Sequence, residues 1–353
     1  MAEPSFESII NDLKKGKYAP VYLLQGDEPY FIDEIVSFIE NNVIDESMRD
    51  FNQTVVYGRD VSARDVADLA SRFPMMGEKQ VVIVKEAQDL TANNRKLDAL
   101  EPYLENPSDS TILVFGFKYK KVDKRTGFFK KIKKIPGAVV FESQKVYDNK
   151  IPGWITGYIE SKGYTIDPVA NQLLADHVGN DISRLVNEIN KLFINFPENG
   201  KITPEVIERN IGISKDYNIF EFTKALGQKN VLKAQQIVKY FEANTKDNPL
   251  PMITVMLYNY FIKIFLYHKA GPGKDRYAMG KILGVNPFLV PEYATAANNY
   301  STKAIRKIIG EIKILDMKGK GFGATDAKNY GPLSEFVYKC IHEQFVTFEE
   351  EEF

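Results

Sequence analysis

The sequence is poor in residues that build covalent or metal-bound scaffolds. Its 353 residues include one cysteine, Cys340, and three histidines, His177, His268 and His342. A single cysteine excludes a disulfide framework and a cysteine-rich zinc site, and it fits a reducing compartment. The histidines do not show a ligand spacing such as a pair four residues apart with a glutamate. We therefore predict no metal site.

Neither a strong net charge nor a membrane-length apolar run is present. The 46 Lys and Arg residues nearly balance the 47 Asp and Glu residues, which leaves a net charge of -1. The field of the whole molecule therefore cannot drive strong non-specific DNA binding. The most apolar stretch, Met252 to His268, contains Asn259 and Lys263 and falls short of the roughly 20 residues that cross a bilayer. We predict a buried bundle helix there, no membrane contact, no secretory signal and a cytoplasmic location.

The first part of the chain has the pattern of a parallel sheet covered by helices. Short β-branched runs recur at 21–24, 53–57, 80–84, 111–115 and 138–141, separated by segments with helical spacing. This alternation predicts an α/β domain with helices on both faces of the sheet. The second helix is the clearest, because Ser62 and Asp65 form a capping box before inward positions Val66, Leu69, Ala70 and Phe73. Pro74 is expected to end it.

After about residue 145 the strand signal gives way to helix starts. Asp167, Thr203 and Asp181 are expected to cap helices of a small helical domain over 145–212. A helix bundle follows over 213–348, in which Asn286-Pro287 begins a helix. Ser301 caps another, whose expected inward residues are Ile305, Ile308, Ile309, Ile312 and Leu315. The acidic tail 349–353 is predicted to be disordered.

A phosphate-binding loop is missing where such a sheet usually carries one. A Walker A loop needs Gly, four residues, Gly-Lys and then Ser or Thr after the first strand. Here residues 26–33 read GDEPYFID, with Phe31, Ile32 and Asp33 in the last three places. The third strand is followed by Lys85-Glu86, and a lysine cannot hold magnesium. We therefore predict an ATPase-like fold without nucleotide chemistry and without a cofactor.

Several segments in this order resemble the delta subunit of the bacterial DNA polymerase III clamp loader. They are PVYLLQGDEPYFIDE (20–34), FPMMGEKQVVIVKEA (73–87), KKVDKRTGFFKKIKK (120–134), IPGWITGYIESKGYTID (151–167), HVGNDISRLVNEINKL (177–192), NIFEFTKALG (218–227) and ILDMKGKG (314–321). The resemblance implies an AAA+-like domain over 1–144, a helical lid domain over 145–212 and a helical collar domain over 213–348 that joins a ring of subunits.

The resemblance also implies a non-catalytic task in DNA replication, as an accessory subunit of a DNA-directed DNA polymerase holoenzyme. Delta subunits bind and open the beta sliding clamp, while ATP-binding partners drive the cycle. The implied partners are the clamp, the gamma/tau and delta prime subunits of a heteropentamer, and primer-template DNA.

In the family, two exposed apolar residues after the second helix contact the clamp. They correspond to Met75 and Met76, with Phe73 and Arg72 beside them. This pair departs from the leucine-phenylalanine pair of some relatives, but methionine adapts to irregular pockets. The alternative is that both methionines cover the sheet as core residues.

Two basic segments allow further contacts. Lys118 to Lys134 holds nine basic residues, and Phe128, Phe129, Ile132 and Ile135 are spaced to face inward, so its charges are expected to face solvent or a partner. A second basic set contains Lys303, Arg306, Lys307, Lys313, Lys318 and Lys320. Phe322, beside this set in the glycine-rich turn 319–323, either stacks on a primer-template end, as an aromatic residue does in some relatives, or packs within its loop.

Two other functions stay open at this point. One is a diverged phosphate-loop NTPase with an unrecognised nucleotide site. The other is a DNA-binding replication or repair accessory protein, which the near-neutral charge disfavours.

Overall fold

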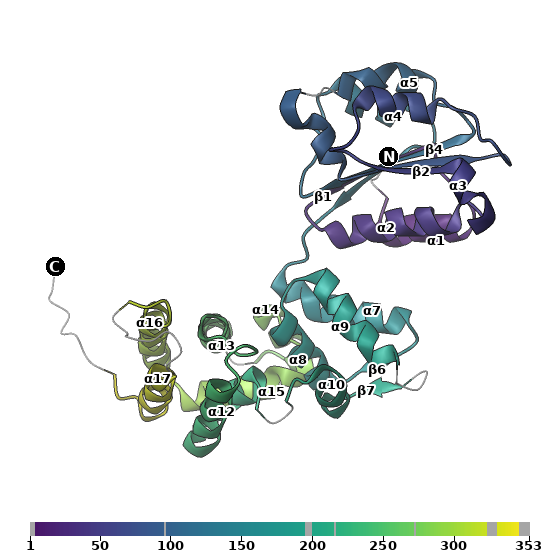
Figure 1. Ribbon diagram of the computed structural model, residues 1–353. Coiled ribbons are helices and arrows are strands. Elements are labelled where there is room, and N and C mark those ends of the chain that lie inside the picture. Colours follow the sequence, from purple (N-terminus) through teal and green to yellow (C-terminus); the bar gives the residue numbers. More distant parts are fainter. Residues whose placement is uncertain are drawn as a thin grey trace. The chain divides into compact units, whose positions relative to one another are not determined.

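A computed structural model describes residues 4–94, 97–194, 200–214, 217–271, 273–322 and 330–345. The chain divides into two compact units, Met1–Val146 and Tyr147–Phe353, which are described separately (Figure 1). The predicted disordered tail 349–353 lies outside the described residues.

The first unit is built on a parallel sheet. Its strands are β1 (Val21–Gly26), β2 (Gln53–Tyr57), β3 (Gln80–Lys85), β4 (Thr111–Lys118) and β5 (Val139–Ser143). They lie in the order β2-β3-β4-β1-β5, and all neighbouring pairs run parallel. The five predicted strands are therefore confirmed, and each of their predicted starts lies within one residue of the observed one.

Helices cover both faces of this sheet, as predicted. One face packs against α1 (Phe6–Lys14) and α2 (Pro29–Asn42), and the other against α4 (Ala63–Ala70), α5 (Glu101–Glu105) and α6 (Gly127–Lys134) (Figure 1). Along β1, Val21 and Leu23 enter one core while Tyr22 and Leu24 enter the other, which is the alternation expected of a strand buried on both sides. The short segments η1 (Glu46–Met48), α3 (Arg49–Asn52), η2 (Ala87–Asn94) and η3 (Leu97–Leu100) complete the connections.

Helix α4 confirms its predicted start but not its predicted end. The Ser62 amide donates to Asp65 Oδ2 at 2.7 Å, and the Asp65 amide donates to Ser62 Oγ at 3.2 Å, which together form the capping box. The helix ends at Ala70, before the turn that would carry Phe73 to the inward face. The inward position predicted for Phe73 is therefore wrong, because its side chain is exposed.

The second unit begins with a small group of helices. These are α7 (Ile151–Ser161), which follows η4 (Asp148–Lys150), then α8 (Pro168–Val178), α9 (Ile182–Ile194) and α10 (Pro204–Ile211). Asp167 and Asp181 cap α8 and α9 as predicted, since they accept from the amides of Val169 and Arg184 at 2.9 Å. Thr203 precedes α10 but forms no side-chain cap, so that prediction is wrong. Strands β6 (Thr165–Ile166) and β7 (Lys201–Ile202) pair in parallel and were not predicted.

The rest of this unit is a helix bundle. Its helices are α11 (Ile219–Gly227), α12 (Val231–Ala243), α13 (Leu250–Ala270), α14 (Arg276–Leu283), α15 (Val290–Asn299), α16 (Thr302–Gly319) and α17 (Gly331–His342), with η5 (Pro287–Leu289) before α15. Helix α13 is long and apolar enough to cross a membrane by length and composition alone. However, Ile253, Leu257, Phe261 and Ile264 on one side of it are buried in the bundle core, so the predicted bundle helix is confirmed.

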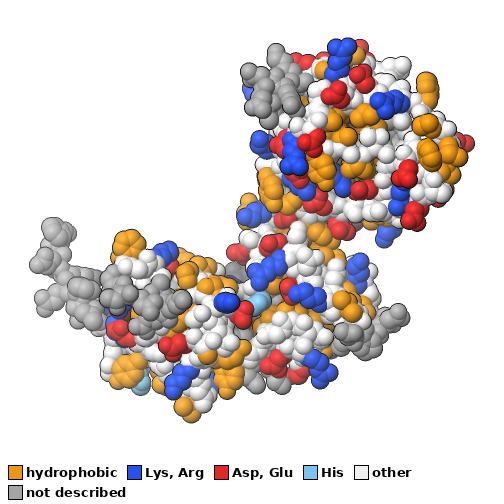
Figure 2. All heavy atoms as spheres, viewed as in Figure 1, with side chains coloured by type: hydrophobic (Ala, Val, Ile, Leu, Met, Phe, Trp, Pro, Cys, Tyr) orange, Lys and Arg blue, Asp and Glu red, His pale blue; other side chains and the backbone are white. Residues whose placement is uncertain are grey.

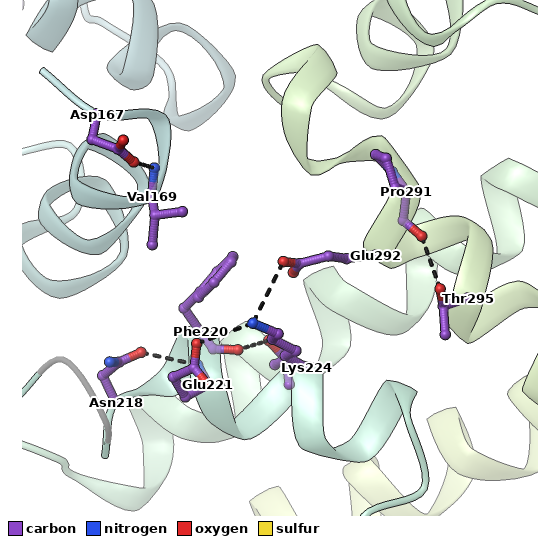
Figure 3. A network of polar contacts seen from close by, with 10 residues as sticks. Asp167, Val169, Asn218, Phe220, Glu221, Lys224, Pro291, Glu292 and Thr295 are labelled. Atoms are coloured by element: carbon purple, nitrogen blue, oxygen red, sulfur yellow. Dashed lines mark hydrogen bonds and ion pairs between the residues drawn. The ribbon is translucent and has the colours of Figure 1, made fainter. Parts of the chain in front are cut away.

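A polar network joins α11 to α15 (Figure 3). Lys224 Nζ lies 3.5 Å from Glu221 and 3.9 Å from Glu292, and burial raises the pKa of Glu292 against the attraction of this lysine. Beside the network, Leu173 of α8 packs with Phe220 and Leu289 in one apolar cluster. Residues on either side of position 212 therefore pack together within one unit, and the division into lid and collar domains there stays a prediction.

Candidate contact surfaces

The loop between α4 and β3 presents the methionine pair to solvent. The side chains of Phe73, Met75 and Met76 are 83%, 77% and 52% exposed, and Arg72 is exposed beside them. Figure 2 shows hydrophobic side chains on the surface of the first unit. The alternative in which the methionines are core residues is contradicted. Exposure is what a contact with another protein requires, and the contact itself stays a prediction.

Two buried side-chain amides hold the backbone of this loop, one at its start and one at the methionine pair. Gln80, at the start of β3, donates to the carbonyls of Ala70 and Arg72 and to the hydroxyl of Thr111. Asn52, at the end of α3, bonds the backbone of Met75 and Met76. Neither amide could be predicted from the sequence, because a lone Asn or Gln beside a strand carries no periodic or spacing signal.

At the end of β1, where a phosphate loop would lie, a side chain of the protein itself caps the backbone at the start of the next helix. A nucleotide phosphate in such folds sits at the N-terminus of the following helix. Here the buried Glu28 caps α2, and its carboxylate accepts from the Tyr30 amide at 3.4 Å. Gly26 adopts φ +137°, and a Cβ at this position would lie 2.1 Å from the Ser143 carbonyl oxygen. The backbone of β5 therefore lies directly against this turn.

Cations near this turn are already paired with carboxylates. Lys121 Nζ lies 2.9 Å from both Asp27 Oδ2 and Glu142 Oε1, and Lys124 lies 3.2 Å from Glu142 Oε2. The hydrogen bond to Glu142, followed by that to Asp27, raises the pKa of Lys121. The hydrogen bond from Lys121 correspondingly lowers the pKa of Glu142, against the effect of burial.

The end of β3 is likewise arranged as ion pairs. Lys85 Nζ lies 2.7 Å from Glu40, while Lys118 Nζ lies 2.8 Å from Asp33 and 2.9 Å from Glu86. Although burial acts in the opposite direction, hydrogen bonds from Lys118 and Gln88 lower the pKa of Glu86. Within the described ranges, no group of three or more His, Cys, Asp and Glu side chains could hold a metal ion.

The basic segment from Lys118 to Lys134 is less available than its composition suggests. Phe128, Phe129 and Ile132 of α6 are buried as predicted, and so is Ile135 after it. Beyond the pairs already given, Lys131 Nζ lies 2.8 Å from Glu101 and 2.7 Å from Glu105. Most of these charges are exposed as predicted, and only Lys118 and Lys131 are half-buried. Carboxylates of the same unit pair with several of them, which the sequence did not indicate.

The end of α16 carries the other basic set. The backbone closes the helix through Gly321, at φ +88°, and the Phe322 amide donates to the Met317 carbonyl at 3.0 Å. The Phe322 side chain is 67% exposed, which contradicts the packed-loop alternative. Lys313 is exposed, while Lys318 and Lys320 pair with Glu335 and Asp316 at 3.4 and 2.6 Å. Contact of Phe322, Lys313, Lys318 and Lys320 with DNA stays a prediction, and Gly323 lies outside the described residues.

Comparisons with known proteins support the resemblance. The model of the family described as "DNA polymerase III, delta subunit" matches residues 22–144. The DNA polymerase III subunit delta of Bacillus subtilis is 29% identical over 317 residues, which cover 87% of this chain and 90% of that protein. The structure of the Bacillus subtilis DNA clamp loader delta protein aligns with a TM-score of 0.54 and 26% identity, covering 96% of this chain and 100% of that one.

Proposed function

Because this chain belongs to the DNA polymerase III delta-subunit family, we propose that it binds a beta-type sliding clamp and holds the clamp open for loading onto primed DNA. The observation that supports this most strongly is the exposed apolar loop of Phe73, Met75 and Met76, with Arg72 as a polar rim contact. Apolar side chains surrounded by polar ones are typical of protein-protein contacts. Binding of the full chain to the purified clamp of its own organism, measured by surface plasmon resonance, tests the proposal.

The methionine pair cannot supply the whole affinity. Nanomolar binding corresponds to about 12 kcal/mol, far more than two side chains contribute on leaving water. Further surface must therefore join the contact, and Phe51 at the end of α3 is a suitable addition because it is exposed next to Asn52. If the clamp does not bind at micromolar concentrations, the proposal fails.

We further propose that the chain performs this task without binding ATP and without catalysis of its own. Two arrangements support this. The Glu28 carboxylate caps the N-terminus of α2, where a phosphate would bind, and Lys121 forms ion pairs with Asp27 and Glu142. A negatively charged phosphate would meet these carboxylates at close range. Equilibrium binding of labelled ATP to the purified chain tests this, and micromolar affinity would favour the NTPase alternative.

The second unit supplies surfaces for the other proposed partners. Val255, Tyr258 and Leu266 form an exposed apolar stripe on α13, with successive spacings of three and eight residues, which we assign to contact with the gamma/tau or delta prime subunits. Exposed Phe322 is assigned to primer-template DNA. The proposed site of action is the cytoplasm, as expected of a replication protein. Co-purification of the chain with these subunits, with and without Tyr258→Ser, tests the assignment to α13.

A further inference from the structure

The methionine loop has few contacts of its own that could fix its shape. From residue 71 to residue 79 the side chains are exposed, apart from the half-buried Pro74. Apolar groups that point into solvent do not hold a loop in one conformation, and an unanchored loop must be ordered when it binds. The conformation of Met75 and Met76 therefore depends on how their backbone is held.

The side chain of Asn52 holds this backbone. Its Oδ1 accepts from the Met75 amide at 2.9 Å and from the Met76 amide at 3.2 Å, and its Nδ2 donates to the Met76 carbonyl. Asn52 is 4% exposed, so water competes little for these bonds. It directly precedes β2, whose first residue Gln53 is in register with Val81 of β3. The backbone of Asn52 is therefore anchored next to the sheet, while the methionine side chains are exposed to solvent.

We propose that Asn52 is a positioning residue that holds Met75 and Met76 in the conformation that contacts the clamp. This inference rests on the proposed function, because it concerns the same contact. Asn52 need not touch the clamp. It lowers the cost of ordering the loop, and a pre-ordered loop binds more tightly with the same contacts.

The test compares Asn52→Ala and Asn52→Asp with wild type in the full chain. Asn52→Ala is expected to weaken binding to the purified clamp about tenfold, which corresponds to the net worth of one hydrogen bond. It is also expected to speed hydrogen exchange at the Met75 and Met76 amides. Asn52→Asp keeps an acceptor for both amides, but it loses the donor and places a buried carboxylate against the Met76 carbonyl, so its affinity should also fall below that of wild type. Asn42→Ala, at an exposed asparagine of the same unit, is the matched control and should leave both measurements unchanged.

Combination with Met75→Ser and Met76→Ser separates positioning from a general structural role. Since Asn52 acts through the methionines, Asn52→Ala should weaken binding no further in the double-serine background. An additive loss there, or unchanged affinity and exchange in Asn52→Ala alone, would refute the positioning role. If the clamp still binds the double-serine variant with wild-type affinity, the proposed contact fails and the role of Asn52 in it fails as well.

Discussion

Replacement of both Met75 and Met76 by serine is the sharpest test of the proposed contact. The two side chains are already exposed in the free chain, so their loss removes little from the folded state. Exposed substitutions away from caps and networks usually change the free energy of unfolding by less than about 0.5 kcal/mol. The melting temperature should therefore stay close to that of wild type.

The effect on clamp binding should be much larger. Full burial of a methionine side chain contributes about 1.5 to 3 kcal/mol. Scaling this range by the exposed fractions of 77% and 52% gives about 2 to 4 kcal/mol for the pair. The dissociation constant should therefore rise about 30-fold to 1000-fold.

Surface plasmon resonance on the immobilised clamp, together with thermal unfolding of the same preparations, measures both quantities. Met317→Ser is a suitable control, because this methionine is also exposed but belongs to the second unit. Its affinity for the clamp should equal that of wild type. A melting temperature lowered by many degrees in the double variant, or a dissociation constant changed less than threefold, would refute the reasoning.

Four further outcomes are expected. Gly26→Ala should lower the free energy of unfolding by about 2 to 4 kcal/mol in urea, because its Cβ would collide with the Ser143 carbonyl at a strained φ. Gly310→Ala should instead raise it by about 0.5 to 1 kcal/mol, since the site on α16 is open. Burial raises the pKa of Asp176 to about 6, above its value in the unfolded chain, so its contribution to stability is complete below about pH 4 and is lost as the pH rises through 6. Asp176→Asn should accordingly be more stable than wild type at pH 7, by about 1 to 3 kcal/mol, and equal to it near pH 4. Phe322→Ala should weaken binding of a primer-template at fixed salt about fivefold to 100-fold without changing the unfolding midpoint. An unchanged affinity would show that Phe322 does not contact the DNA.

The sequence predicted the elements whose signals are local. The five strands are β-branched runs bounded by polar residues, and each lies on a sheet buried on both faces, where composition and burial agree. The capping box at Ser62 and the cap at Asp167 were also predictable, because a cap depends on residues two or three positions away.

Predictions that depend on distant residues failed or could not be made. The helical spacing of Val66 and Ala70 would continue to Phe73. However, the helix ends at Ala70, where the Gln80 side chain donates hydrogen bonds to the carbonyls of Ala70 and Arg72. The ion pairs of Lys118 and Lys131 could not be predicted, because their carboxylate partners are remote in sequence. The exposure of the methionine pair followed only from a family resemblance, since a buried and an exposed methionine have the same local sequence signal.

The cap at the start of α2 has a consequence for how this fold could change. Glu28 now completes the helix, Gly26 lets β1 approach β5, and Lys121 joins Asp27 to Glu142. Substituting Asp27 or Glu28 toward a nucleotide-binding loop would remove a stabilising contact while the other carboxylates still repel phosphate. Single substitutions toward such a loop therefore pass through chains that are less stable and still repel phosphate, which makes the present arrangement persistent.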